Sequence, residues 1–190
     1  MKTENRVLMR QAREALDGRW GLAIGVFLLF ILISSCIPGV NIIISGPMTV
    51  GMAGFSLKLS RRQQADVPDL FTGFNNFWNA LLAYLLIIVF VVLWSLLLII
   101  PGIIAAISYS QTFYILSENP SIDPSDAIDK SKEMMYGYKA KYFRLCLNFF
   151  GWALLCCLTL GIGFFFLIPW MQVTFAGFYD DLKKNETSYN

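Results

Sequence analysis

The chain has no histidine, and long parts of it carry no charge. Three runs, residues 20–57, 70–117 and 145–179, contain no Asp, Glu, Lys or Arg. Histidine is the side chain that most readily exchanges protons near neutral pH. Ionisable groups inside membrane segments are the usual mark of proton relays, ion sites and voltage sensors. Their joint absence argues against a proton-driven pump and against a voltage sensor.

The sequence also lacks the short motifs of common enzyme classes. It has no Gly-x-Ser-x-Gly, no phosphate-binding loop and no paired metal ligands. The four cysteines lie inside the uncharged runs without metal-ligand spacing, which predicts plain membrane-buried thiols at Cys36, Cys146, Cys156 and Cys157. Acidic residues near expected helix starts are interpreted as helix caps: Asp66, Asp69, Asp123 and Asp126. We therefore expect a protein that is not an enzyme, with no cofactor and no metal.

The chain is rich in hydrophobic residues, and its uncharged runs are long. Hydrophobic residues make up 56% of it and charged residues 15%, which is outside the range of soluble domains. Even the shortest uncharged run, 145–179, would form a helix of roughly 52 Å at about 1.5 Å per residue. A bilayer core is only about 30 Å thick and is crossed by about 20 residues. Each run is therefore expected to cross twice.

The predicted fold class is an all-α integral membrane protein. Six transmembrane helices form three repeated helical hairpins, with short amphipathic cytoplasmic helices between them. The expected spans are roughly 20–37, 40–57, 78–100, 102–117, 143–160 and 164–179. The whole chain, 1–190, is taken as a single membrane domain.

The basic residues predict the orientation. All fifteen Lys and Arg lie in four blocks, 1–19, 58–69, 118–144 and 180–186. If every uncharged run is a hairpin, all four blocks emerge on one side, which the positive-inside rule makes cytoplasmic. Both termini are then cytoplasmic. In the alternative, the weakly apolar stretch 40–57 does not cross and block 58–69 lies outside, which fits the charges less well.

Three units, about 1–60, 61–120 and 121–190, repeat a common order of elements. Residues 48–55 and 171–178 are identical at five of eight positions. Turns are expected at Ile37-Pro38-Gly39-Val40, Ile100-Pro101-Gly102-Ile103 and Leu160-Gly161-Ile162-Gly163. The competing interpretation is that general membrane composition produces this likeness by coincidence.

Each unit is expected to begin with a short amphipathic helix in the headgroup plane. These helices are predicted over 4–17, from Asp66-Val67-Pro68-Asp69 onward, and over 124–136. Each is expected to end at a glycine in the left-handed conformation: Gly18, Gly73 and Gly137.

Polar side chains within the spans give the candidate site. Thr49, Gln111 and Gln172 fall at corresponding places in the three returning arms, and Asn148 is a further amide. An unpaired amide in hydrocarbon costs a few kcal/mol, so we expect the first three to converge. They form either structural hydrogen bonds or a polar layer lining a ligand cavity. Separately, basic residues near the third unit are expected to contact lipid headgroups: Lys130, Lys132, Lys139 and Lys141.

Ordered polar and aromatic positions resemble those of a known bacterial family. The matching stretches are Asp69-Leu70-Phe71-Thr72-Gly73-Phe74, Pro101-Gly102-Ile103-Ile104, Tyr109-Ser110, Asn119-Pro120, Ala127-Ile128 with Ser131, Met135-Tyr136-Gly137-Tyr138-Lys139, Phe149-Phe150-Gly151-Trp152, Leu158-Thr159-Leu160-Gly161-Ile162-Gly163, Pro169-Trp170 and Phe178-Tyr179. The chain resembles the family known as domain of unknown function number 975, integral membrane proteins found mainly in Firmicutes. More distantly, it is similar to membrane domains attached to some glycerophosphodiester phosphodiesterases, without their catalytic domain. The resemblance implies a bacterial cytoplasmic-membrane protein and supplies no functional residues.

Two classes of function fit these observations. The first is a non-enzymatic polytopic membrane protein that binds lipid or a small amphipathic ligand, or assists a membrane partner. The second is a small oligomeric transporter or channel. The expected partners are membrane lipids and another membrane protein or a second copy of the chain. The net charge of +2 is too small to suggest nucleic acid.

Overall fold

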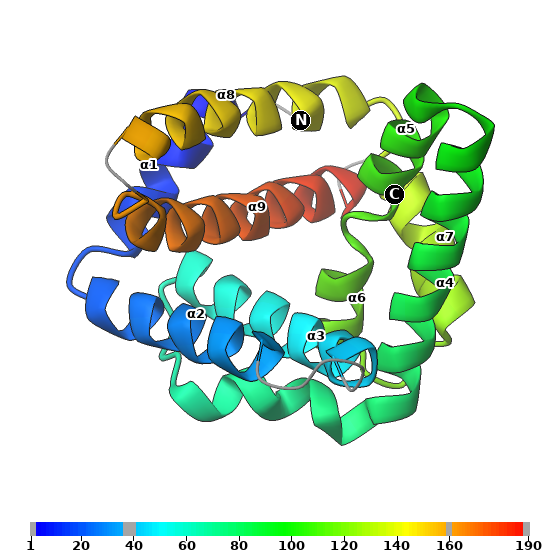
Figure 1. Cartoon of the computed structure of the whole chain (residues 1–190), viewed down its shortest axis with the longest axis horizontal. Coiled ribbons are helices and arrows are strands. Elements are labelled where there is room, and N and C mark those ends of the chain that lie inside the picture. Colours follow the sequence, from blue (N-terminus) through cyan, green and yellow to red (C-terminus); the bar gives the residue numbers. More distant parts are fainter. Residues whose placement is uncertain (1–2, 36–40, 159–160, 188–190) are drawn as a thin grey trace.

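The computed structural model describes residues 3–35, 41–158 and 161–187, and within these residues it contains helices joined by turns and short irregular segments, with no strand (Figure 1). The elements in chain order are α1 (Asn5–Ala15), α2 (Trp20–Ser35), α3 (Asn41–Ser60), the 3-10 helix η1 (Val67–Asn76), α4 (Phe77–Leu97), α5 (Ile99–Tyr109), α6 (Thr112–Glu118), α7 (Pro124–Met134), α8 (Lys139–Leu158) and α9 (Phe164–Thr187).

Several of these helices are long and apolar enough to cross a membrane. Within the described residues, three segments meet that standard: Ile42–Ser60, Val67–Leu96 and Ile99–Glu118. A fourth is reached if α1 and α2, which meet at a bend of 98°, form one broken span. The helical membrane class is therefore supported, while the count of six spans stays a prediction.

The apolar helices divide into central and peripheral ones. Helix α3 contacts both α6 and α9 at the centre of the molecule, whereas α4 lies at its edge (Figure 1). The most apolar window of the α3 span is 61% buried, but that of the span containing α4 is only 17% buried. The exposed side chains of α4 are large and hydrophobic, among them Val89, Val92 and Leu93. This exposed face is suited to contact with lipid.

Helices lie where short amphipathic ones were predicted. Helix α1 buries one face, formed by Leu8, Met9, Ala12 and Ala15. Helix α7 begins as expected, because the Asp123 carboxylate accepts a hydrogen bond of 2.9 Å from the Ser125 N–H and Pro124 follows the cap. In the second unit the helix is of the 3-10 type. There the Asp66 N–H donates to the Asp69 carboxylate at 2.9 Å.

Two of the three glycine stops are confirmed. Gly18 and Gly137 have φ angles of +72° and +78°, the left-handed region that glycine adopts at low cost. The prediction for Gly73 is wrong, since it does not have a positive φ and lies within η1. A Cβ at Gly73 would lie 2.0 Å from the Pro47 carbonyl oxygen. Because Gly73 has no side chain, η1 can contact α3 closely at this position.

The predicted second turn, at Ile100-Pro101-Gly102-Ile103, is also wrong. The chain breaks earlier, at Leu98, whose φ and ψ of −163° and 144° are extended. Pro101 then falls in the first turn of α5, where its missing N–H has no intrahelical partner to lose. The first predicted turn, 37–40, lies outside the described residues. In the third predicted turn, Gly161 has a φ of +87°, which is in the left-handed region.

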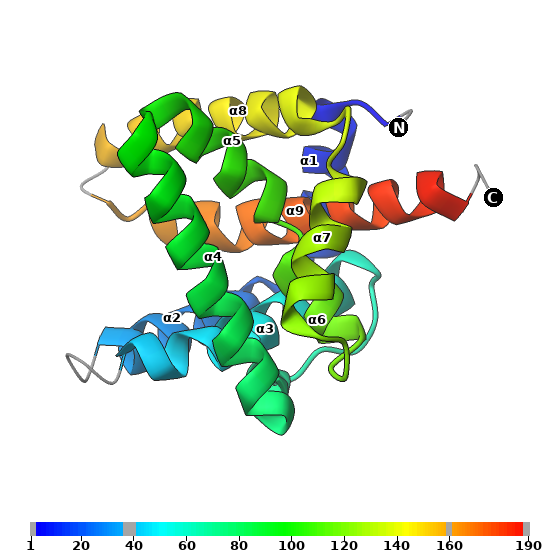
Figure 2. The same ribbon diagram turned by 90° about the vertical axis from the view of Figure 1, so that its right-hand side faces the viewer.

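The predicted continuous span 102–117 is interrupted, because α5 ends at Tyr109 and α6 begins at Thr112. A side chain of α7 satisfies the backbone at this break. The buried Ser131 hydroxyl donates to the Ser108 carbonyl at 2.7 Å and accepts from the Gln111 N–H at 3.2 Å. Irregular backbone at membrane depth is tolerated where protein groups satisfy it in this way. Figure 2 shows α7 beside α5 and α6.

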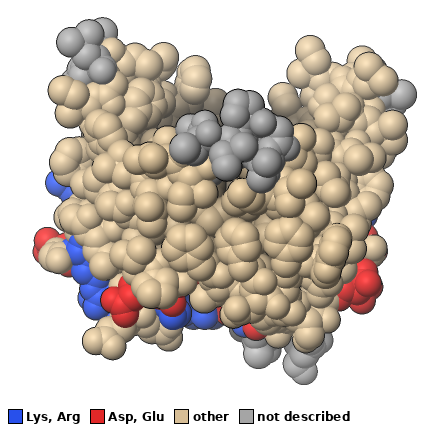
Figure 3. Space-filling view, turned by 60° about the horizontal axis from the view of Figure 1, so that its bottom comes forward, with Lys and Arg blue, Asp and Glu red and all other residues tan. Residues whose placement is uncertain are grey.

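Charged side chains are unevenly distributed over the face shown in Figure 3. On the face shown in Figure 3, acidic and basic side chains lie along the lower edge, and the part above them is uncharged.

Candidate functional site

A central cavity of about 530 Å³ lies among α2, α3, the α5–α6 break, α8 and α9. Its wall is mainly apolar: Phe27, Phe30, Ile31, Met52, Ala53, Phe113, Ile168, Met171 and Phe175. Five lining residues have polar groups: Thr49, Ser110, Tyr114, Tyr142 and Gln172. A mostly apolar hollow of this size with a few polar groups is typical of small-molecule sites.

Two of the residues predicted to form a polar layer meet at this cavity. Thr49 and Gln172 come from α3 and α9 and line the same space. The Thr49 hydroxyl donates to the Ser45 carbonyl at 2.6 Å, within its own helix. The Gln172 amide has no hydrogen-bond partner among the described residues and borders the cavity. Gln172 is therefore a polar group available to a guest.

Gln111 lies behind the cavity wall. Its side chain is fully buried, and its amide N–H donates to the Ser110 hydroxyl at 2.8 Å. Ser110 itself lines the cavity and donates to the Ile107 carbonyl at 2.8 Å. The Gln111 side-chain carbonyl is buried and has no partner in the described part of the chain. Gln111 thus contacts Ser110, which lines the cavity, but does not line it itself.

Asn148 and the four lysines do not line the central cavity. Asn148 is exposed and lines a separate groove of about 720 Å³ that includes Arg6, Lys141 and Arg144. The Lys141 ammonium there donates to the Thr3 carbonyl, and burial lowers the pKa of Lys141 while Asp181 raises it.

Of the other lysines, Lys132 and Lys139 line one groove on another side of the molecule. Lys130 is not among the residues that line it. The four lysines therefore do not all line the same groove. Their roles, and those of the polar layer, stay predictions.

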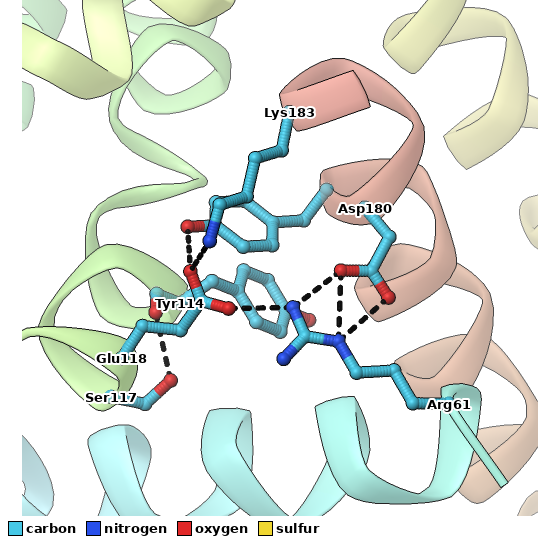
Figure 4. A network of polar contacts seen from close by, with 7 residues as sticks. Arg61, Tyr114, Ser117, Glu118, Asp180 and Lys183 are labelled. Carbon is cyan, nitrogen blue, oxygen red and sulfur yellow. Dashed lines mark hydrogen bonds and ion pairs between the residues drawn. The ribbon is translucent and has the colours of Figure 1, made fainter. Parts of the chain in front are cut away.

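Sequence reasoning missed a cluster of charges at the ends of three helices (Figure 4). We call Arg61, Glu118, Asp180 and Lys183 the charge cluster. The Arg61 guanidinium contacts Glu118 at 2.5 Å and Asp180 at 2.6 Å. Lys183 reaches the other Glu118 oxygen at 2.6 Å, and the Tyr179 hydroxyl donates to that oxygen at 2.7 Å.

The charge cluster joins elements that are distant in sequence. Arg61 follows α3, Glu118 ends α6, and Asp180 and Lys183 belong to α9. The hydrogen bond to Asp180 raises the pKa of Arg61 above its ordinary value, burial opposes this, and Glu118 adds to it. The sequence held one signal: Glu118 and Asp180 are the first charges after the runs 70–117 and 145–179.

Comparison with known proteins supports the resemblance drawn from the sequence. Residues 1–108 and 95–186 match the family described as "Protein of unknown function (DUF975)". The chain belongs to this family. No curated protein and no solved structure matches the chain. The family description states no activity, so a function has to be argued from the cavity and its surroundings.

Proposed function

We propose that this member of the family is a non-enzymatic protein of the bacterial cytoplasmic membrane that holds one lipid-like amphipathic molecule in the central cavity. The observation that carries the proposal is the unpartnered Gln172 amide at the border of a mainly apolar hollow. An amide left without a partner in hydrocarbon costs a few kcal/mol. A guest that hydrogen-bonds Gln172 removes that cost.

The residues that line the cavity indicate the chemistry of the guest. Its residues include no Asp, Glu, Lys or Arg, so the enclosed part of the guest is uncharged. Aromatic and aliphatic side chains fill most of the wall and favour an apolar body. Ser110 and Gln172 favour a hydroxyl, ester or amide on that body, because both side chains can donate and accept hydrogen bonds.

The same proposal includes six spans with both termini cytoplasmic. Its support is the pairing of consecutive helices: α2 contacts α3, α4 contacts α5, and α8 contacts α9. The returning helices α3, α6 and α9 meet at the centre, and the charge cluster joins their ends. Charges gathered along one edge agree with a single cytoplasmic face (Figure 3).

Cysteine labelling tests this topology. In a variant whose four native cysteines are replaced by serine, Ile99→Cys is expected to react with a membrane-impermeant maleimide added to intact cells. Gln64→Cys is expected to react only after the cells are opened. Both positions are exposed, so access to reagent depends on the side of the membrane. Labelling of Gln64→Cys in intact cells would contradict the proposed orientation.

The cavity is tested by replacing its unpartnered amide. Gln172→Leu should reduce the fraction of protein that retains a co-purifying molecule in native mass spectra by about fivefold, because one hydrogen bond contributes about 1 kcal/mol. Its melting temperature should not fall, since Gln172 makes no hydrogen bond within the described structure.

Asn148→Leu is the matched control, because it removes an exposed amide that lies outside the cavity. It should leave retention unchanged. If Gln172→Leu lowers the melting temperature and leaves retention intact, the amide is structural and the cavity is not the site.

A further inference from the structure

A second hollow, the lateral groove, opens among α4, α5, α7 and the start of α8. Its volume is about 380 Å³, and it is lined by Trp94, Pro101, Ile104, Ala105, Ser108, Tyr109, Lys132, Tyr136 and Lys139. It shares no lining residue with the central cavity. The sequence predicted a lipid-headgroup role for Lys132 and Lys139, and the fold places both in this groove.

The two ends of the lateral groove differ in chemistry. Along α5, the wall runs from Pro101 in the first turn to Tyr109 at the helix end, about 12 Å at 1.5 Å per residue. The Lys132 ammonium lies 5.7 Å from the centre of the Tyr109 ring. The Lys132 cation is therefore at the Tyr109 end, and apolar side chains extend away from it along α5. This layout matches an amphiphile with an anionic head.

No carboxylate in the groove competes with that head, since its lining residues include two lysines and no Asp or Glu. Lys139 has no partner among the described residues. Lys132 contacts Asp129 at 2.7 Å, but both side chains are exposed to solvent, by 44% and 67%. Exposed pairs of this kind hold together weakly, so the Lys132 ammonium is free to turn toward a phosphate.

The apolar end of the groove is open to the surroundings. Trp94 and Ile104 are exposed large hydrophobic side chains, on α4 and α5 respectively. In the proposed membrane placement they face the acyl chains of the bilayer. Tyr136, highly exposed at the cationic end, has the amphipathic character of residues found at the membrane interface.

We propose that the lateral groove binds one anionic phospholipid. The phosphate lies between the Lys132 and Lys139 ammonium groups, and one acyl chain follows α5 against Trp94 and Ile104. This site rests on the membrane placement proposed above and does not depend on a guest in the central cavity. The charge complementarity and the apolar extension together select an anionic lipid over a neutral one.

The charged end is tested with the full chain in nanodiscs of phosphatidylglycerol and phosphatidylcholine with identical acyl chains, followed by native mass spectrometry. Wild-type protein should retain phosphatidylglycerol preferentially. Lys132→Gln combined with Lys139→Gln should weaken that retention about thirtyfold, since each lysine near an anionic surface contributes about 1 kcal/mol. The control Arg13→Gln with Lys130→Gln removes the same charge outside the groove and should have little effect. Equal weakening by both pairs would overturn the site.

A matched pair of substitutions, at Ile104 and Ile103, tests the apolar end of the groove. Ile104 lines the groove and Ile103 does not, yet their exposed fractions are 47% and 46%. Ile104→Trp should fill the groove and lower phosphatidylglycerol retention at least fivefold, whereas Ile103→Trp should not.

Two further readouts separate the possible outcomes. Displacement of the lipid by millimolar inorganic phosphate, together with no effect of Ile104→Trp, would show a phosphate site and overturn the lipid proposal. The molecule retained in the central cavity should be unchanged in all these variants. Failure of the groove is therefore distinguishable from failure of the proposed function.

Discussion

Replacing Gly51 by alanine is expected to destabilise the protein by about 3 kcal/mol or more, at the upper end of overpacking effects. A Cβ at Gly51 would lie 1.8 Å from the Leu70 carbonyl oxygen and 2.6 Å from the carbon of that carbonyl. Both atoms belong to the η1 backbone, so no side-chain rotation relieves the clash. The loss should appear as a lower melting temperature and a smaller yield of monodisperse protein.

Gly54 supplies the control for this change. It lies in the same helix, and a Cβ there would meet its nearest neighbour, the Ser117 Cβ, at an ordinary 3.5 Å. Both substitutions gain about 1 kcal/mol in helix propensity, so Gly54→Ala should keep or raise the melting temperature. Gly73→Ala should behave like Gly51→Ala, because it meets α3 from the other side of the contact. Equal stability of Gly51→Ala and Gly54→Ala would show that α3 and η1 do not pack this closely.

Gly73 also shows where prediction from the sequence ends. Helix positions depend on local chemistry. The helical character of the uncharged runs, the Asp123 cap and the helix stops at Gly18 and Gly137 could therefore be predicted. A glycine needed for a left-handed turn and a glycine needed for close packing look alike in a sequence. Only the approach of Pro47 from another helix distinguishes the two at Gly73.

The candidate site at the central cavity could likewise be predicted only in part. Comparison of the repeats placed Thr49 and Gln172 at similar depths, and they line one cavity. Gln111 could not be placed, because its setting depends on the helix break that Ser131 satisfies from α7. The charge cluster was missed for a related reason. A charge pattern gives depth in the membrane but not the lateral neighbours that pair Arg61 with Glu118 and Asp180.

The second large effect is expected at Arg61. Arg61→Met removes the cation shared by the Glu118 and Asp180 carboxylates, whose side chains are only 16% and 18% exposed, and Glu118 keeps its contact with a second cation, Lys183. Removing one partner of a fully buried pair costs about 3–5 kcal/mol, and of an exposed pair about 1 or less. This half-buried cluster should lose about 2–3 kcal/mol. Thermal unfolding in detergent measures the loss.

Neutralising the acids identifies the source of that loss. Glu118→Gln with Asp180→Asn, added to Arg61→Met, should recover much of the stability, because no carboxylate then remains at the junction and Lys183, which loses its contact with Glu118, is half exposed to water. A cycle of these variants isolates the coupling between the guanidinium and the two acids. Recovery would show that the loss of stability arises from carboxylates left without the Arg61 cation and not from lost packing of the arginine side chain.

Arg62→Met is the matched control, since Arg62 is the next residue and its side chain is 65% exposed in a 3.3 Å contact with Glu14. It should change stability by less than about 1 kcal/mol. Should Arg61→Met be equally mild, the charge cluster does not hold the ends of α3, α6 and α9 together. Their convergence around the central cavity would then depend on apolar packing alone, including the stacked Tyr114 and Tyr179 rings 5.5 Å apart.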